Sequence, residues 1–100
     1  MTAIVQINFP FAGPAADLRT AMLAAAPKFT GMNGLVWKVW LVDEARKEGG
    51  GIYLSSSRAL ADAFAAGNIV AELRKSRPGA EVKVFDDFRE ASTLTGATFD

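Results

Sequence analysis

The sequence contains no cysteine and no histidine, and these two absences narrow its possible chemistry. Without cysteine there is no disulfide and no thiolate nucleophile. Without histidine, the Ser-His-Asp and Cys-His arrangements are excluded as well, and only oxygen donors remain for a metal ion. We therefore expect no transition-metal centre, and any proton transfer must use Asp, Glu, Lys or Tyr.

An excess of charge is also absent, because eleven Lys and Arg balance eleven Asp and Glu. Without a broad basic field to attract phosphates, nucleic acid is not expected as a partner. Long apolar runs are missing too: Leu35–Val42 is interrupted by Lys38 and is far shorter than the ~20 residues of a membrane helix. The first residues lack the basic start of a signal peptide, so we expect a soluble, cytoplasmic protein without membrane contact.

Apolar residues, in contrast, are abundant: half of the chain is hydrophobic and a tenth is aromatic. A chain of 100 residues forms one domain with a thin core, and we interpret residues 1–100 as that single domain. The apolar content exceeds what one small core needs. The surplus favours a partner surface or a pocket.

The hydrophobic pattern predicts the order strand, helix, two strands, helix, strand. The expected elements are a strand over Ala3–Phe11, a helix over Pro14–Lys28, strands over Leu35–Val42 and Ile52–Ser55, a helix from Ser56 or Ser57 to Arg77 with an interruption at Gly67, and a strand over Ala80–Phe88. The segment Asp43–Gly51 ends in three glycines, and we expect it to be a hairpin turn. No lysine-serine pair follows these glycines, which disfavours a phosphate-binding loop.

This order is that of the split βαβ arrangement, so the fold class is α+β, with a ferredoxin-like βαββαβ chain. Its four-stranded antiparallel sheet carries helices on one face only. The other face must be covered, and a second copy of the chain is the simplest cover, which gives a homodimer and a dimeric α/β barrel. The tail, Arg89–Asp100, is expected either to reach that partner or to fray.

The candidate site residues are aromatic and polar side chains that fall on the central strands. They are Gln6, Asn8, Trp37, Lys38, Trp40 and Tyr53. Strand alternation places Trp37 and Lys38 on opposite faces and Trp40 on the face of Lys38. Two interpretations stay open: a pocket for a planar ligand, or a core in which the polar groups find internal partners.

Two basic features also have two interpretations each. In the first interpretation Lys38 belongs to a functional site. In the second it has a structural role, in which it pairs with a carboxylate across the sheet or extends to the rim of the sheet. The cluster Arg74, Lys75 and Arg77 lies at the C-terminal end of a helix, where cations favourably meet the negative end of the helix dipole. A solvated helix end is favoured there over an anion site.

Several segments together resemble the YdhR-type monooxygenases. The signature is Leu35–Trp40 followed by Gly50–Leu54, and Gln6–Phe9, Gly13-Pro14 and Val82–Asp86 resemble the first and last strands of that family. The resemblance covers almost the whole chain. It departs from the family pattern at Asn8, where histidine is frequent, and at Ser55, where a bulky aromatic residue often follows Leu54.

The resemblance implies a ferredoxin-like dimeric α/β barrel, related in fold to small cofactor-independent monooxygenases that oxidise polycyclic phenols. On that basis the hypothesis is a monooxygenase that uses O₂ on a small aromatic, phenol- or quinol-like compound, with no cofactor and no metal. In this hypothesis the candidate catalytic residues are Lys38, Asn8 and Tyr53. The candidate substrate-binding residues are Trp37, Trp40 and Gln6. The alternative is a non-catalytic small-molecule-binding or stress-related dimeric module.

Overall fold

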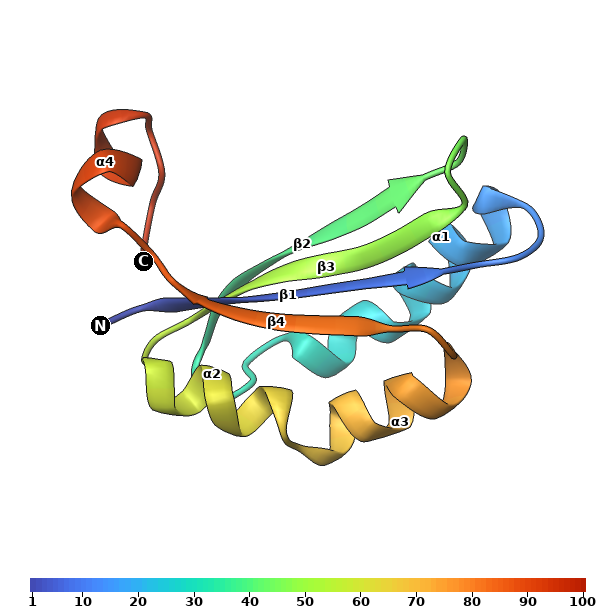
Figure 1. The fold of residues 1–100 in the computed structure, drawn as a ribbon, viewed down its shortest axis with the longest axis horizontal. Helices are drawn as coiled ribbons and strands as arrows, with labels where there is room; N and C mark the ends of the chain where they lie inside the picture. Colours follow the sequence, from blue (N-terminus) through green and yellow to red (C-terminus); the bar gives the residue numbers. More distant parts are fainter.

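The computed structural model describes all 100 residues and confirms the predicted order of the main elements (Figure 1). These are β1 (Ala3–Pro10), α1 (Ala15–Ala25), the 3₁₀ helix η1 (Ala26–Phe29), β2 (Leu35–Asp43), β3 (Glu48–Ser55), α2 (Arg58–Ala65), α3 (Asn68–Ser76), β4 (Glu81–Asp86) and α4 (Arg89–Leu94). The four strands form one antiparallel sheet in the order β2-β3-β1-β4. The fold is therefore the expected α+β, ferredoxin-like arrangement.

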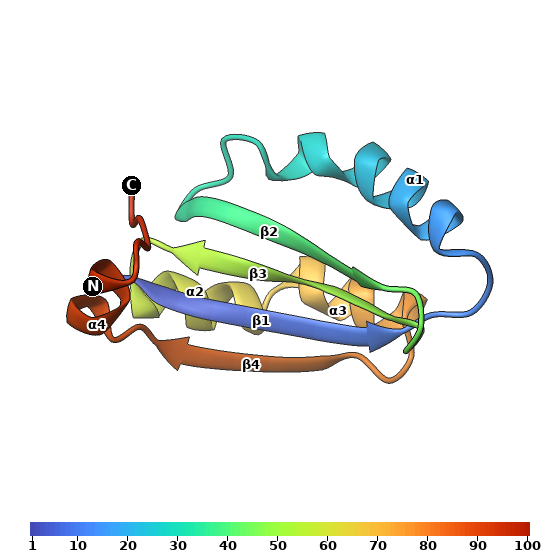
Figure 2. The same cartoon turned by 90° about the horizontal axis from the view of Figure 1, so that it is seen from above.

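The helices α1, α2 and α3 lie on one face of the sheet, whereas α4 lies on the opposite face at the end where both termini are found (Figure 1). The helix α2 packs on β1 and β4, and α1 packs on β2. Figure 2 shows α1 along the β2 edge and α2 and α3 behind the other strands. None of these helices has the length and apolar character needed to span a lipid bilayer.

The core lies between the sheet and these helices, and β1 supplies its centre. Val5 and Ile7 are almost fully buried on the helix face, whereas Gln6 and Asn8 point to the other face, which we call the open face. This alternation is the one the sequence predicts. Cross-strand pairing carries it into the neighbours, so that Tyr53 of β3 shares the helix face with Val5.

The three consecutive glycines are not the hairpin turn, and this expectation was wrong. Gly49, Gly50 and Gly51 belong to β3 and are paired on both sides, with β1 and with β2. The turn is Glu44–Lys47, where Lys47 has a φ of 54°. Glycine is required at Gly50, where a Cβ would lie 1.9 Å from the backbone carbonyl oxygen of Ile7. At Gly49 the absent side chain leaves room for the side chain of Leu18.

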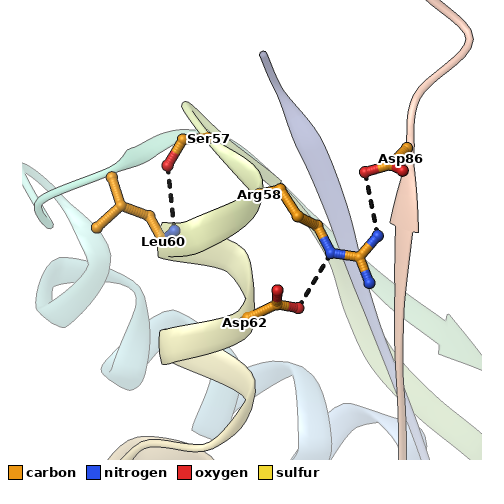
Figure 3. Close-up of polar contacts among 5 residues, drawn as sticks. All are labelled: Ser57, Arg58, Leu60, Asp62 and Asp86. Carbon is orange, nitrogen blue, oxygen red and sulfur yellow. Dashed lines mark hydrogen bonds and ion pairs between the residues drawn. The ribbon is translucent and has the colours of Figure 1, made fainter.

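The helix α2 begins where the sequence indicates, because the Oγ of Ser57 accepts a hydrogen bond of 3.1 Å from the backbone N–H of Leu60 (Figure 3). Next to this cap, Arg58 donates to Asp62 within the helix and to Asp86 at the end of β4. The break at Gly67 is present as predicted and separates α2 from α3.

The tail adopts an arrangement that was not among the expected ones. It forms α4 and then turns back over the open face of its own sheet, where Trp37 Nε1 donates a hydrogen bond of 3.0 Å to the carbonyl of Thr98. The guanidinium of Arg89 also stacks on Phe99, 4.4 Å from its ring centroid. The tail therefore covers the Trp37 end of the open face within one chain.

Candidate functional site

A cavity of about 550 Å³ lies between the helix face of the sheet and the helices α1, η1 and α3. This volume is in the range of pockets that hold a small organic ligand. Most of its lining is hydrophobic, with side chains from the sheet and from the helices that cover it. The residues that line it are Ile7, Phe9, Leu18, Ala21, Met22, Ala25, Lys28, Phe29, Lys38, Trp40, Gly50, Gly51, Tyr53, Phe64, Asn68, Ile69, Val70, Glu72, Leu73, Ser76 and Arg77.

Glycines on the floor of the cavity make room for longer side chains above them. Gly51 lies directly across from Trp40 in β2 and from Ile7 in β1. A Cβ on Gly51 would come within 2.9 Å of Lys38 Cε and 3.3 Å of Tyr53 Cε1. The absent side chain therefore lets the stem of Lys38 lie along the floor of the cavity.

Three aromatic rings surround the ammonium group of Lys38. Its Nζ lies 3.2 Å from the ring centroid of Trp40, 3.8 Å from that of Phe29 and 4.5 Å from that of Tyr53. The rings also support one another, since Phe29 meets Trp40 edge-on with centroids 5.5 Å apart. An ammonium group is attracted to such ring faces, so this aromatic cage holds the amine inside the cavity.

The cage supplies no counter-charge. Lys38 forms no ion pair and donates no hydrogen bond within the chain. The expectation that a carboxylate pairs with it across the sheet is therefore wrong, because its neighbour across the strand is Tyr53. Burial in apolar surroundings lowers the pKa of Lys38 from 10.5 to about 7. Near neutral pH the group can thus accept a proton as well as donate one.

Tyr53 forms the wall beside Lys38 and is only 5% exposed. Burial raises the pKa of its hydroxyl to about 12, so the phenol keeps its proton across the physiological range. The hydroxyl makes no hydrogen bond within the chain, in contrast to the internal partner expected for a core tyrosine. Since no fully buried side-chain polar atom lacks a partner, this hydroxyl has access to open space and can donate to a ligand.

The structure divides the predicted site residues between the two faces of the sheet. Lys38, Trp40 and Tyr53 come together in the cavity on the helix face. The other three residues, Gln6, Asn8 and Trp37, lie on the open face, because their strand positions alternate with those of the cavity residues. There Gln6 Nε2 donates a hydrogen bond of 2.9 Å to Asn8 Oδ1.

Sequence reasoning missed the part of the cavity that the helices contribute. Phe29 at the end of η1 and Phe64 of α2 line the cavity, although the hydrophobic pattern indicates only that they are apolar helix positions. Phe64 meets Tyr53 with ring centroids 4.8 Å apart. The available signal in the sequence was its high phenylalanine content. A phenylalanine side chain has no polar atom that would indicate a functional site.

The three basic residues at the C-terminal end of α3 have different roles. Arg74 donates to the carbonyl of Ala80 and Lys75 pairs with Glu72, as expected for a solvated helix end. Arg77 instead turns to the cavity, and its Cζ lies 5.1 Å from the ring centroid of Phe9. Elsewhere in the chain, no group of three Asp or Glu side chains is placed to hold a metal ion.

Comparison with known proteins places these features in a family. Residues 4–98 match the model of the family described as "Putative mono-oxygenase ydhR". The fold is similar to the crystal structure of a protein of unknown function from Nitrosomonas europaea, with a TM-score of 0.69 and 15% sequence identity over 87% of this chain and 89% of that one. No curated protein matches the sequence.

Proposed function

The chain belongs to the ydhR mono-oxygenase family, and on that premise we propose that it oxidises a small phenol- or quinol-like compound with O₂. The proposed reaction uses neither a flavin nor a metal, since an electron-rich phenolate can pass electrons to O₂ itself. The protein then has to bind, deprotonate and desolvate its substrate. The cavity on the helix face is the proposed site.

One observation carries this proposal: the amine of Lys38 lies inside an aromatic cage, without a carboxylate partner, and its pKa is lowered to about 7. A neutral amine in such a cavity takes the proton of a bound phenol. The product is an ammonium next to a phenolate, and the apolar walls strengthen the attraction between them because they exclude water. Flat walls such as Trp40 favour a planar substrate.

The proposed steps balance without an added reductant. The phenol proton moves to Nζ of Lys38, and the phenolate gives one electron to O₂. The aryloxyl radical and superoxide then combine, which forms a C–O bond at a ring carbon ortho or para to the phenolic oxygen. The hydrogen of that carbon passes to the departing oxygen as the O–O bond breaks, which yields a quinone and hydroxide. The ammonium of Lys38 protonates the hydroxide to water.

Oxygen uptake tests this proposal. We expect the protein to consume one O₂ per quinone formed from at least one member of a panel of phenols, naphthols and hydroquinones, measured with an oxygen electrode and by mass spectrometry. Labelled ¹⁸O₂ should place one oxygen atom in the quinone. Binding of panel members without any protein-dependent uptake would instead support the alternative, a non-catalytic binding module.

The second part of the proposal concerns the open face, which we propose is covered by a second copy of the chain. Large apolar side chains remain uncovered there, with Val39 49% and Phe85 47% exposed. An exposed apolar sheet face of this kind is typical of a protein interface. Gln6 and Asn8 lie in its middle, so their proposed role is at the dimer interface and not at the substrate.

Replacement of Val39 by aspartate should therefore convert the dimer into a monomer, because each copy would bring an unpaired charge into an apolar interface. Sedimentation velocity measures the change in mass. Leu23→Asp is the matched control, since Leu23 is 77% exposed on α1 and is not on the sheet. A wild-type protein that sediments as a lone 10.6 kDa particle would contradict the proposal.

A further inference from the structure

We infer that the cavity is built for an aromatic compound that carries a carboxylate as well as a phenol, and that Arg77 binds the carboxylate. The phenol part of this inference rests on the proposed function, whereas the carboxylate part stands on the charges of the cavity. It narrows the substrate class from any phenol to hydroxylated aromatic acids.

The charged lining of the cavity is almost entirely basic. Lys28, Lys38 and Arg77 line it, and Glu72 is its only carboxylate. Glu72 already pairs with Lys75, with 3.5 Å between the charged atoms. None of the three basic groups in the cavity has an ion pair or a side-chain hydrogen bond. Lys38 is only partly charged near neutral pH, because burial lowers its pKa to about 7. Lys28 and Arg77 still give the cavity an unbalanced positive charge, which attracts an anionic ligand.

This imbalance is not a property of the whole surface, because the chain has no net charge. Outside the cavity, basic groups commonly have partners: Arg46 pairs with Asp43, Arg58 with two aspartates, and Arg89 with Asp87. Four of the eight basic groups outside the cavity form ion pairs, whereas none of the three that line it does. The guanidinium of Arg77 therefore has no counter-charge within the chain. A ligand that brings its own carboxylate would supply the missing counter-charge.

Lys38 and Arg77 lie over different points of the cavity floor. The stem of Lys38 lies over Gly51, and the guanidinium of Arg77 lies over Phe9, which pairs with Gly49. Gly49 and Gly51 are two residues apart on one strand, which corresponds to roughly 7 Å along the sheet. That interval leaves room for at least one aromatic ring between a phenolic oxygen at Lys38 and a carboxylate at Arg77.

Arginine suits this role because its planar guanidinium offers parallel N–H donors to both oxygens of a carboxylate. The guanidinium carbon lies 5.1 Å from the ring centroid of Phe9, and the guanidinium N–H donors make no hydrogen bond within the chain. Arg77 is half-buried at the end of α3, so the ion pair would form partly out of water, where it is stronger than at the open surface.

Calorimetric titration under nitrogen tests the inference without any oxidation. The probes are 6-hydroxy-2-naphthoate and its neutral counterpart 6-hydroxy-2-naphthamide, which share the rings and the phenol. We expect the acid to bind roughly tenfold more tightly than the amide. Arg77→Gln should remove this preference, Arg77→Lys should keep part of it, and Arg74→Gln, on the solvated side of the same helix end, should leave it unchanged.

The outcomes separate this inference from the proposed function. Equal binding of acid and amide, or binding of neither, overturns the carboxylate site even if phenols are oxidised. A preference that survives Arg77→Gln overturns the assignment to Arg77. A preference that depends on Arg77 supports the site, and it does so even if no oxygen is consumed, in which case only the monooxygenase proposal fails. Urea denaturation of each variant verifies that the fold is intact.

Discussion

Replacement of Gly50 by alanine is expected to lower the free energy of unfolding by about 3 kcal/mol or more, which is a large part of the stability of a small domain. A Cβ at this position would lie 1.9 Å from the carbonyl oxygen of Ile7 and 3.1 Å from the Cα of Asn8. Both are backbone atoms of β1, the strand that pairs with β3. The clash can be relieved only if the two central strands separate.

The backbone conformation of Gly50 adds to this cost. Its φ of 156° is rarely adopted by residues with a side chain. Since β3 is also hydrogen-bonded to β2 on its other side, the strand cannot rotate this residue without losing pairing there. Strain and clash therefore act together at the centre of the sheet, where no flexible neighbour can absorb them.

Two other glycines serve as controls in urea denaturation followed by circular dichroism. Gly13→Ala should lower the free energy of unfolding by only about 1 kcal/mol. The φ of 83° disfavours a side chain there, but nothing lies within 4 Å of the added carbon. Gly51→Ala should leave most of the stability, since the stem of Lys38 can move away, but it should disturb the site. A Gly50→Ala protein as stable as the Gly13→Ala protein would contradict the argument.

The fold could be predicted because hydrophobic alternation and helical spacing agree along the chain. Val5, Ile7 and Phe9 alternate with less buried residues in the structure as in the sequence. The glycine run could not be interpreted in the same way. A glycine signals either a turn or a close approach of other groups, and the Leu18 and Lys38 side chains that fill the space come from distant positions or another strand.

The candidate site could be predicted only in part, for a geometric reason. Alternation correctly grouped Trp40 with Lys38 and separated Trp37 from them, since it depends on one strand. Which face the helices cover depends on the handedness of connections across the whole sheet. The cavity itself depends on how α1 and α3 are placed over the sheet. Arg77 lines this cavity, although the sequence pattern indicated a solvated helix end at its position.

Replacement of Lys38 by methionine is expected to lower the rate of phenol oxidation by about a hundredfold to ten-thousandfold, the range that one well-placed acid–base group contributes. Methionine keeps the length and apolar contacts of the lysine stem, so the cage of Trp40, Phe29 and Tyr53 stays filled. It removes only the amine. Lys83→Met, on the open face in β4, is the matched control and should keep full activity.

The pH dependence of the rate provides a readout that a merely structural role would not move. The wild-type value of kcat/KM should rise as pH increases through about 7, where Lys38 loses its proton and becomes able to accept one. It should fall again above about pH 10, where a free phenol ionises and has no proton to give. The rise through 7 should be missing in Lys38→Met. A variant that keeps both the rate and this rise would refute the assignment of Lys38 as the base.

The same substitution should stabilise the protein, and most strongly at low pH. Between pH 7 and 10.5 the unfolded chain holds the Lys38 proton whereas the folded chain has released it, so the stability conferred at this position rises with pH across that window. Below pH 7 both states are protonated, and the folded protein bears the full cost of a partly buried ammonium. Lys38→Met removes that cost, so its advantage in urea midpoint over the wild type should be largest at pH 6 and should shrink toward pH 10. An advantage that does not change with pH would mean that the amine is not desolvated in the cage, and the proposed base would then be charged at neutral pH.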